Sequence, residues 1–184
     1  MPSNNITADG IVRDARSRYQ KRAEGGAHGA FEAETKRAGG SPRAEVEVTR
    51  GTAPADIADI LGEGSAEVVI RSRRMYDGER LVQLADTYIP GFVAEAAPAV
   101  AQLDTGAGGI ISRMADAGLA QTDVVEDVTQ APATADQAEA LGVEEGELLL
   151  TITHTGRTED GRAVEVSRHI LGRGWTLRYG VPLA

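Results

Sequence analysis

Arg71 and Arg73 are the side chains in this sequence best suited to bind an anion. They lie in the run "AEVVIRSRRMYDG", whose β-branched residues predict a strand, so residues two apart should share one face. A guanidinium group can donate two parallel hydrogen bonds to a carboxylate or a phosphate. The alternative is a solvated strand face that also carries Arg74 and protects a sheet edge. The residues alone leave both interpretations open.

A second polar set occurs in the run "RAVEVSRHIL", where Glu165, Ser167 and His169 alternate with apolar residues. In a strand these three side chains share one face. The opposite face would carry Val164, Val166 and Ile170. If the apolar face packs against helices, the polar face could bind hydroxyl or carboxamide groups of a ligand. A solvated sheet face would show the same pattern.

Other chemical signatures are weak. The segment "LDTGAGG" contains the Asp-Thr-Gly of aspartic proteases, but it precedes a predicted helix, where Asp104 or Thr105 is better explained as a cap. The three histidines, His28, His154 and His169, have no metal-binding spacing, and the chain has no cysteine. We therefore expect no metal and no cofactor.

A repeated pattern defines the elements that would position these side chains. "PADIADILG" at 54–62 is followed eighty residues later by "TADQAEALG" at 134–142, and each predicts a short helix ending at a glycine. After each helix come two β-rich runs, joined by Asp77-Gly78 in the first case and by Asp160-Gly161 in the second. Asp-Gly between β-rich runs predicts a hairpin. The chain thus contains two helix–hairpin units, unless both merely follow common helix and hairpin rules.

The remaining elements complete an α+β prediction, a mostly antiparallel sheet flanked by helices. We expect helix over 11–38 with an interruption at "GGAHGA", strands over 43–50, 120–130 and 175–181, a helix broken near Pro98 in "GFVAEAAPAVAQL", and an amphipathic helix in "GGIISRMADAGL".

The charge of the chain is unevenly distributed. The net charge over 184 residues is −9, but residues 1–43 contain eight Lys or Arg and five acidic residues, hence +3, which leaves −12 for the rest. An acidic body repels phosphate backbones, so direct nucleic-acid binding is disfavoured. The sequence shows neither a secretory signal nor a membrane span. Together with the absence of cysteine, this indicates a cytoplasmic chain.

The sequence resembles the UTRA domain, the effector-binding module of the HutC branch of GntR-type transcription regulators, whose fold is shared with chorismate lyase. The resemblance rests on "VVIRSRRMYDGERLVQLADTYIP", "DTGAGGIISRMADAGL", "APATADQAEALGVEEGELLLTITHTGRTEDGRAVEVSRHIL" and "LRYGVP". It implies a joining arm at 1–42 and a small-molecule-binding domain at 43–184. In the family a winged helix-turn-helix normally precedes the joining segment, which resembles this sequence from about Ile11. The roughly ten residues before that point are too few for a helix-turn-helix, so we expect this chain to lack its own DNA-binding domain.

The resemblance implies that a homodimer binds a small, anionic metabolite and reaches DNA only indirectly, through a partner, if at all. The implied ligand-binding residues are Arg71, Arg73, Ser112, Glu165, Ser167 and Tyr179. Ala85 and Ile111 stand where the family often has Glu and Tyr, which implies a ligand less polar than a sugar phosphate. The alternative is an enzyme that uses the same pocket for lyase, isomerase or cyclase chemistry, with Glu165, His169 or Tyr179 as acid or base.

Overall fold

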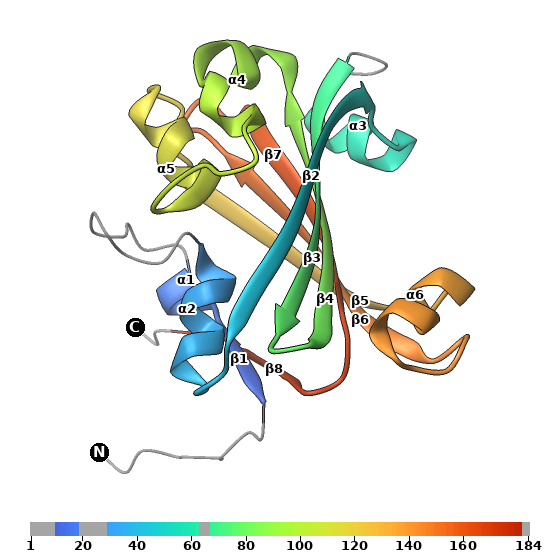
Figure 1. The fold of residues 1–184 in the computed structure, drawn as a ribbon. Helices are drawn as coiled ribbons and strands as arrows, with labels where there is room; N and C mark the ends of the chain where they lie inside the picture. The colour runs from blue at the N-terminus through green and yellow to red at the C-terminus, as the bar shows by residue number, and fades with distance from the viewer. Residues whose placement is uncertain (1–9, 19–28, 63–66, 182–184) are drawn as a thin grey trace.

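The computed structural model describes residues 10–18, 29–62 and 67–181, and its centre is one antiparallel sheet in the order β2-β3-β4-β7-β6-β5 (Figure 1). The six strands are β2 (Pro42–Thr52), β3 (Glu67–Asp77), β4 (Arg80–Pro90), β5 (Asp123–Pro132), β6 (Leu148–Arg157) and β7 (Ala163–Leu171). The predicted α+β class is therefore confirmed.

The two predicted helix–hairpin units are present, and each also includes the strand before its helix. One unit is β2, α3 (Ala55–Leu61) and the β3–β4 hairpin, and the other is β5, α6 (Ala135–Leu141) and the β6–β7 hairpin. Both helices end at a left-handed glycine, Gly62 with φ 71° and Gly142 with φ 65°. Because β4 pairs with β7 at the centre, the strand order of one unit mirrors that of the other.

The two faces of the sheet have different covers (Figure 1). Helices α3 and α6 lie on one face. The other face is covered near one end by α4 (Gly91–Ala96), the 3-10 helix η1 (Pro98–Ala101) and α5 (Gly109–Asp116), which we call the helical cover. Near the other end lie β1 (Ile11–Asp14), α1 (Ala15–Arg18), α2 (Ala30–Arg37) and β8 (Trp175–Arg178), which we call the terminal arm. The break at Pro98 is as predicted.

The terminal arm corrects one prediction. Residues 11–14 form a strand rather than the expected helix, because they pair in parallel with β8, with Ile11 opposite Trp175. Local sequence does not show a partner so distant in the chain. Most of "GGAHGA" lies outside the described residues. The structure does not test the proposed boundary between 42 and 43, which stays a prediction.

The start of α5 corrects another prediction. Its N-cap is Gly108, at φ 79°, and not Asp104 or Thr105. Asp104 instead accepts a hydrogen bond from the amide of Gly106 at 2.8 Å, which closes a turn before the helix.

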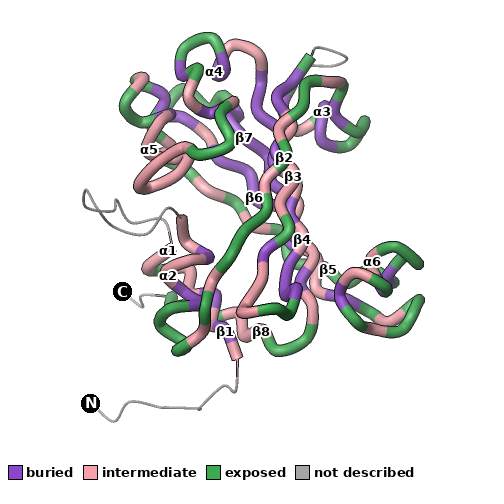
Figure 2. The backbone as a smooth tube through the Cα atoms, viewed as in Figure 1, coloured by how far each residue is buried: buried purple, intermediate pink, exposed green. Residues whose placement is uncertain are grey.

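Both faces bury an apolar core, and the buried residues concentrate along the central strands (Figure 2). Under the helical cover Val69, Ile89, Val100 and Met114 pack together with Val164. Val164 was expected on the opposite face of β7. It joins this core because the β6–β7 pairing shifts its register between Gly156 and Arg157.

The cluster under α3 includes Ile57, Val68 and Val166. Among the described residues no helix is long and apolar enough to cross a membrane.

Candidate functional site

A row of polar side chains crosses the sheet on the face shared by the helical cover and the terminal arm. Strand register places Arg71, Thr87, Ser167, His154 and Glu126 opposite one another on five neighbouring strands. We call these five residues the polar row. The first four are at most 5 % exposed, and so is the Glu126 side chain. Because these side chains are buried, the interpretation of this face as solvated is wrong. Burying a charge is costly unless it is paired, so the charged members of the row should have partners.

Arg73 lies beside the polar row, on β3, and is half-buried. It donates from a terminal nitrogen to Oγ1 of Thr87 at 2.5 Å, and Thr87 Oγ1 lies 2.6 Å from Oγ of Ser167. The buried Nε of Arg73 has no hydrogen-bond partner among the described residues. Burial lowers the pKa of the guanidinium to about 10, although the Glu165 carboxylate opposes this shift. Arg73 is thus a charged donor at neutral pH with capacity to spare.

Arg71 uses its donors differently. One terminal nitrogen donates to the carbonyls of Val100, at 2.8 Å, and Gln102, and the other donates to the carbonyl of Leu103 at 3.1 Å. Burial lowers the pKa of Arg71. The side chain therefore fixes the end of η1 against the sheet, and it contributes positive charge to the row while its donors face the helical cover.

His154 joins two carboxylates at the other end of the row. Its Nε2 lies 3.1 Å from Oε1 of Glu165, and its Nδ1 lies 3.6 Å from Oε1 of Glu126. Gln121 donates to the same Glu165 oxygen at 2.8 Å. Burial alone would lower the pKa of His154, but hydrogen bonds and charge from Glu126 and Glu165 outweigh it and raise the pKa. The pKa of Glu165 is lowered despite its burial, because His154, Gln121 and Arg73 stabilise its anion.

The pKa of His169 is shifted in the opposite direction from that of His154. Burial, followed by the positive charges of Arg13, Arg18 and Arg73, holds the pKa of its imidazole well below the ordinary value. The amide of Gln83 donates to Nδ1 of His169 at 3.0 Å, which assigns the proton of the neutral ring to Nε2.

The terminal arm closes the Glu126 end of the row. Arg13, on β1 and only 2 % exposed, forms an ion pair with Oε1 of Glu126. Tyr179, which follows β8, donates from its hydroxyl to Oε2 of Glu126 at 3.4 Å. Within the arm, Arg18 pairs with the buried Glu34 at 2.5 Å.

The structure brings most of the sequence-derived site residues to one face. Arg71, Arg73, Glu165, Ser167 and His169 lie on or beside the polar row, and Tyr179 reaches it through Glu126. Ser112 lies on α5, and its hydroxyl lies against Gly108, in the space that a Cβ at that glycine would occupy. Among the described residues it makes no contact with the polar row.

Sequence reasoning missed Arg13, Thr87, Gln121, Glu126 and His154. His154 and Glu126 do alternate with residues of the opposite face, but only strand pairing shows that they are opposite each other.

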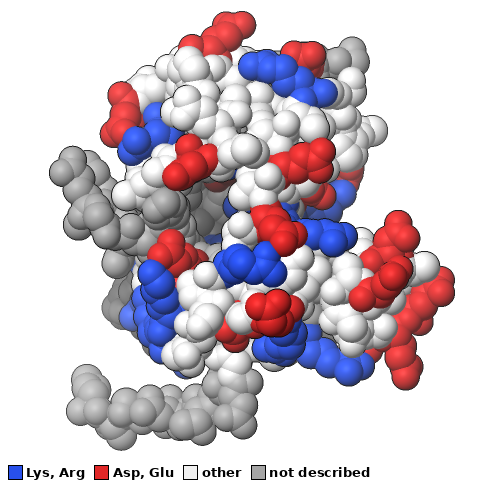
Figure 3. Space-filling model, viewed as in Figure 1, with Lys and Arg blue, Asp and Glu red and all other residues white. Residues whose placement is uncertain are grey.

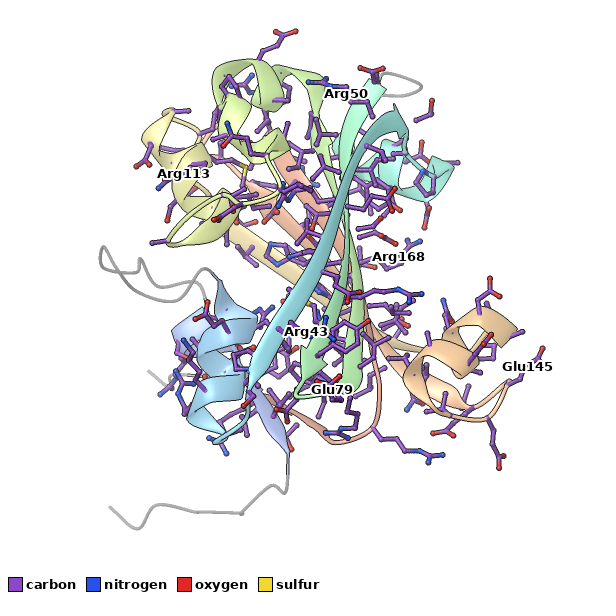
Figure 4. All side chains as sticks on the ribbon, viewed as in Figure 1. Arg43, Arg50, Glu79, Arg113, Glu145 and Arg168 are labelled. Carbon is purple, nitrogen blue, oxygen red and sulfur yellow. The ribbon has the colours of Figure 1, made fainter. Side chains whose placement is uncertain are left out.

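Other features lie away from the row. One cavity of about 460 Å³ is lined by residues that follow α5 and by the β6–β7 turn, and another of about 370 Å³ lies between β5–β7 and α6. Arg168, which lines the second cavity, pairs with Asp56 at 2.5 Å and lies on the opposite side of the sheet from Arg113 of α5 (Figure 4). Within the described ranges, no three His, Asp or Glu side chains are grouped to hold a metal ion.

The surface visible in Figure 3 mixes positive and negative side chains, and acidic groups gather over α6. This face offers no continuous basic surface for a nucleic-acid backbone.

The fold has several counterparts among solved structures. A protein assigned to the GntR family of transcriptional regulators superposes with a TM-score of 0.78 at 21% identity, over 95% of this chain and 69% of that one. PhnF from Mycobacterium smegmatis superposes with a TM-score of 0.71 at 19% identity, over 94% and 73%. A transcriptional regulator from Streptomyces coelicolor superposes with a TM-score of 0.62 at 29% identity, over 77% and 91%.

At such identities the first two likenesses bear on the fold alone. A sequence comparison with curated proteins found no match. The family model described as the UTRA domain matches residues 37–172, which is most of the chain and includes the whole six-stranded sheet. The chain therefore belongs to the UTRA domain family.

Proposed function

We propose that this chain is the sensing domain of a transcription regulator and that it binds a small anionic metabolite at the polar row. The observation that carries the proposal is Arg73, a charged guanidinium whose buried Nε lacks a partner in the described structure. Buried donors are nearly always hydrogen-bonded, so an unpaired charged one points to a ligand. A carboxylate or a phosphate would complete its hydrogen bonds.

The groups around Arg73 suggest the other ligand contacts. The hydroxyls of Thr87 and Ser167 meet next to the guanidinium, and the neutral imidazole of His169 keeps an Nε2–H donor. Ala85 is opposite both Arg73 and His169 in the strand pairing, so a small apolar side chain separates them. This arrangement favours a compact ligand with one anionic group and an apolar part.

The remaining site residues have graded roles in this proposal. Glu165 would accept a hydrogen bond from the ligand, Ser167 would donate or accept one, and Tyr179 and Ser112 would contact it from the two covers. Arg71 would add positive charge while it holds the helical cover in place. We further propose that the chain acts in the cytoplasm as a homodimer and affects DNA only through a partner. Ligand binding would regulate that partner by favouring one conformation over another.

The first experiment is thermal unfolding of the purified chain against a panel of small carboxylates and phosphate esters, followed by mass spectrometry of every stabilising mixture. A ligand raises apparent stability by mass action. We expect at least one anion to stabilise the protein and to be recovered unchanged. A chemically altered compound would overturn the sensor proposal in favour of an enzyme, and stabilisation only by cations would refute the anion site.

The site itself is tested by Arg73→Ala, with Arg74→Ala as the matched control. Arg74 is adjacent in sequence but exposed. Loss of charged hydrogen bonds should weaken the stabilising anion by about 1.5–3 kcal/mol, roughly 10- to 150-fold, as measured by calorimetry. The control should bind normally. Equal affinity in both variants would remove Arg73 from the site.

A further inference from the structure

We infer that Glu126 is a latch residue, which holds the terminal arm on the sheet and makes the docking of the arm depend on the state of the polar row. The inference deepens the proposed function, on which it rests only in the last step, that a ligand is what changes the row. The latch can be tested without a ligand.

The contacts of Glu126 connect the polar row with the terminal arm, two parts of the molecule that are far apart in the sequence. Its Oε1 receives the ion pair from Arg13 of β1 and lies 3.6 Å from Nδ1 of His154. Its Oε2 accepts from Tyr179, beyond β8. One buried carboxylate on an edge strand therefore contacts β1, the residue that follows β8, and the neighbouring imidazole of the row. Breaking such a pair leaves an uncompensated buried charge, which is strongly unfavourable.

Among the described residues, the arm has few other polar attachments to the sheet. β1 and β8 pair with each other and are not part of the six-stranded sheet. The indole Nε1 of Trp175 donates to the carbonyl of Val82 at 2.9 Å, and Ile11 and Phe31 pack with Met75 and Val82. This small apolar contact keeps the arm near the sheet, while the ion pair at Glu126 fixes its far end.

The connection to the ligand residues passes through His154. The imidazole bridges Glu126 to Glu165, and Glu165 is the carboxylate proposed to contact the ligand. A ligand that draws Glu165 away from His154 changes the charge and geometry next to Glu126. The ion pair between Arg13 and Glu126 is then altered, because Arg13 and His154 contact the same oxygen of the Glu126 carboxylate.

The test is amide hydrogen exchange of residues 11–14 and 175–178 in the full chain, with Trp175 fluorescence as a second readout, since it is the only tryptophan. Glu126→Gln removes the charge but keeps the size of the side chain. We expect the arm amides to exchange at least about tenfold faster in this variant, while exchange in β4 and β7 stays unchanged. Asp127→Asn, the adjacent exposed acid on the same strand, is the control and should behave as the parent.

A second variant separates a latch from an ordinary ion pair. His154→Gln removes the imidazole that lies between Glu126 and Glu165, and it should also speed exchange of the arm, by less than Glu126→Gln does. Unchanged exchange in Glu126→Gln would refute the latch. Faster exchange in Glu126→Gln alone would refute the coupling to the row and leave the anion-binding proposal standing, since that is tested at Arg73. If Glu126→Gln unfolds, Arg13→Lys replaces it in the exchange measurement. This variant keeps both charges of the ion pair with Glu126 but changes its geometry, and it should also speed exchange of the arm amides.

Discussion

The β3–β4 and β6–β7 hairpins are built on the same plan and carry different chemistry. Each follows a short helix that ends at a left-handed glycine, and they pair at the centre of the sheet through β4 and β7. On the face that carries the polar row, the first hairpin contributes Arg71 and Arg73, whereas the second contributes His154 and Glu165. The repeated pattern thus serves folding, and the side chains that differ between the halves provide the charge asymmetry of the site.

Among substitutions that test the comparison of the two hairpins, we expect Arg71→Ala to cause the largest loss in the free energy of unfolding. Arg71→Ala removes three hydrogen bonds to backbone carbonyls at the end of η1 and leaves those carbonyls without their donor. We expect a loss of about 3–4 kcal/mol in the free energy of unfolding, measured in urea. Arg74→Ala, which truncates an exposed side chain on the same strand, should change it by no more than about 0.5 kcal/mol. A small effect at Arg71 would mean that the helical cover is held by its apolar core alone.

The shared plan is tested by Gly62→Ala and Gly142→Ala. Both glycines have positive φ, and an added Cβ would meet no atom within 4 Å at either position. The cost is then purely conformational, roughly 1–2 kcal/mol, and should be the same in both halves. Thermal unfolding of the two variants provides the measurement. Costs that differ by more than their experimental error would contradict the equivalence of the two helix ends.

The pH dependence sharpens the difference between the hairpins, because His154 and His169, the histidines that the structure describes, both lie on the second one. The pKa of His154 is raised in the folded state, so its contribution to stability is complete below about pH 6.5 and is lost as the pH rises through the folded value. The pKa of His169 is lowered, so folding loses stability as the pH falls below about 6.5.

We expect His169→Gln to lose less stability than the parent on acidification from pH 7 to 5, and His154→Gln to lose more. Each difference is at most about 1.4 kcal/mol per pH unit. Urea unfolding at several pH values measures it, with His169→Gln and His154→Gln serving as controls for each other. Identical pH profiles in the two variants would contradict the assignment of opposite protonation states.

Much of the fold could be predicted from local pattern. The Asp77-Gly78 and Asp160-Gly161 turns, the helix ends at Gly62 and Gly142, and the break at Pro98 depend on backbone preferences that act within a few residues. One failure occurred where a distant partner overrode local preference. Residues 11–14 became a strand because β8 was available. A second failure was local: Asp104 closes a turn with Gly106, and the helix begins later, at Gly109 with Gly108 as its N-cap.

The candidate site divides in the same way. Alternation along single strands was enough to put Arg71 with Arg73, and Glu165 with Ser167 and His169, because side chains alternate with period two. Alternation could not show that Arg71, Thr87, Ser167, His154 and Glu126 form one row, since that depends on the register between strands far apart in the chain.

The sequence by itself determined the two helix–hairpin units, the excess of acid outside the N-terminal segment and the polar faces of two strands, because each follows from residue type and short-range spacing. Only the tertiary structure decided that these faces are buried and that the donors of Arg71 hold the helical cover. It also decided that the Nε of Arg73 has no hydrogen-bond partner among the described residues and that Arg13 reaches Glu126. The reason is physical: burial, register and ion pairing depend on which distant segments pack together, and that is settled by the free energy of the whole fold.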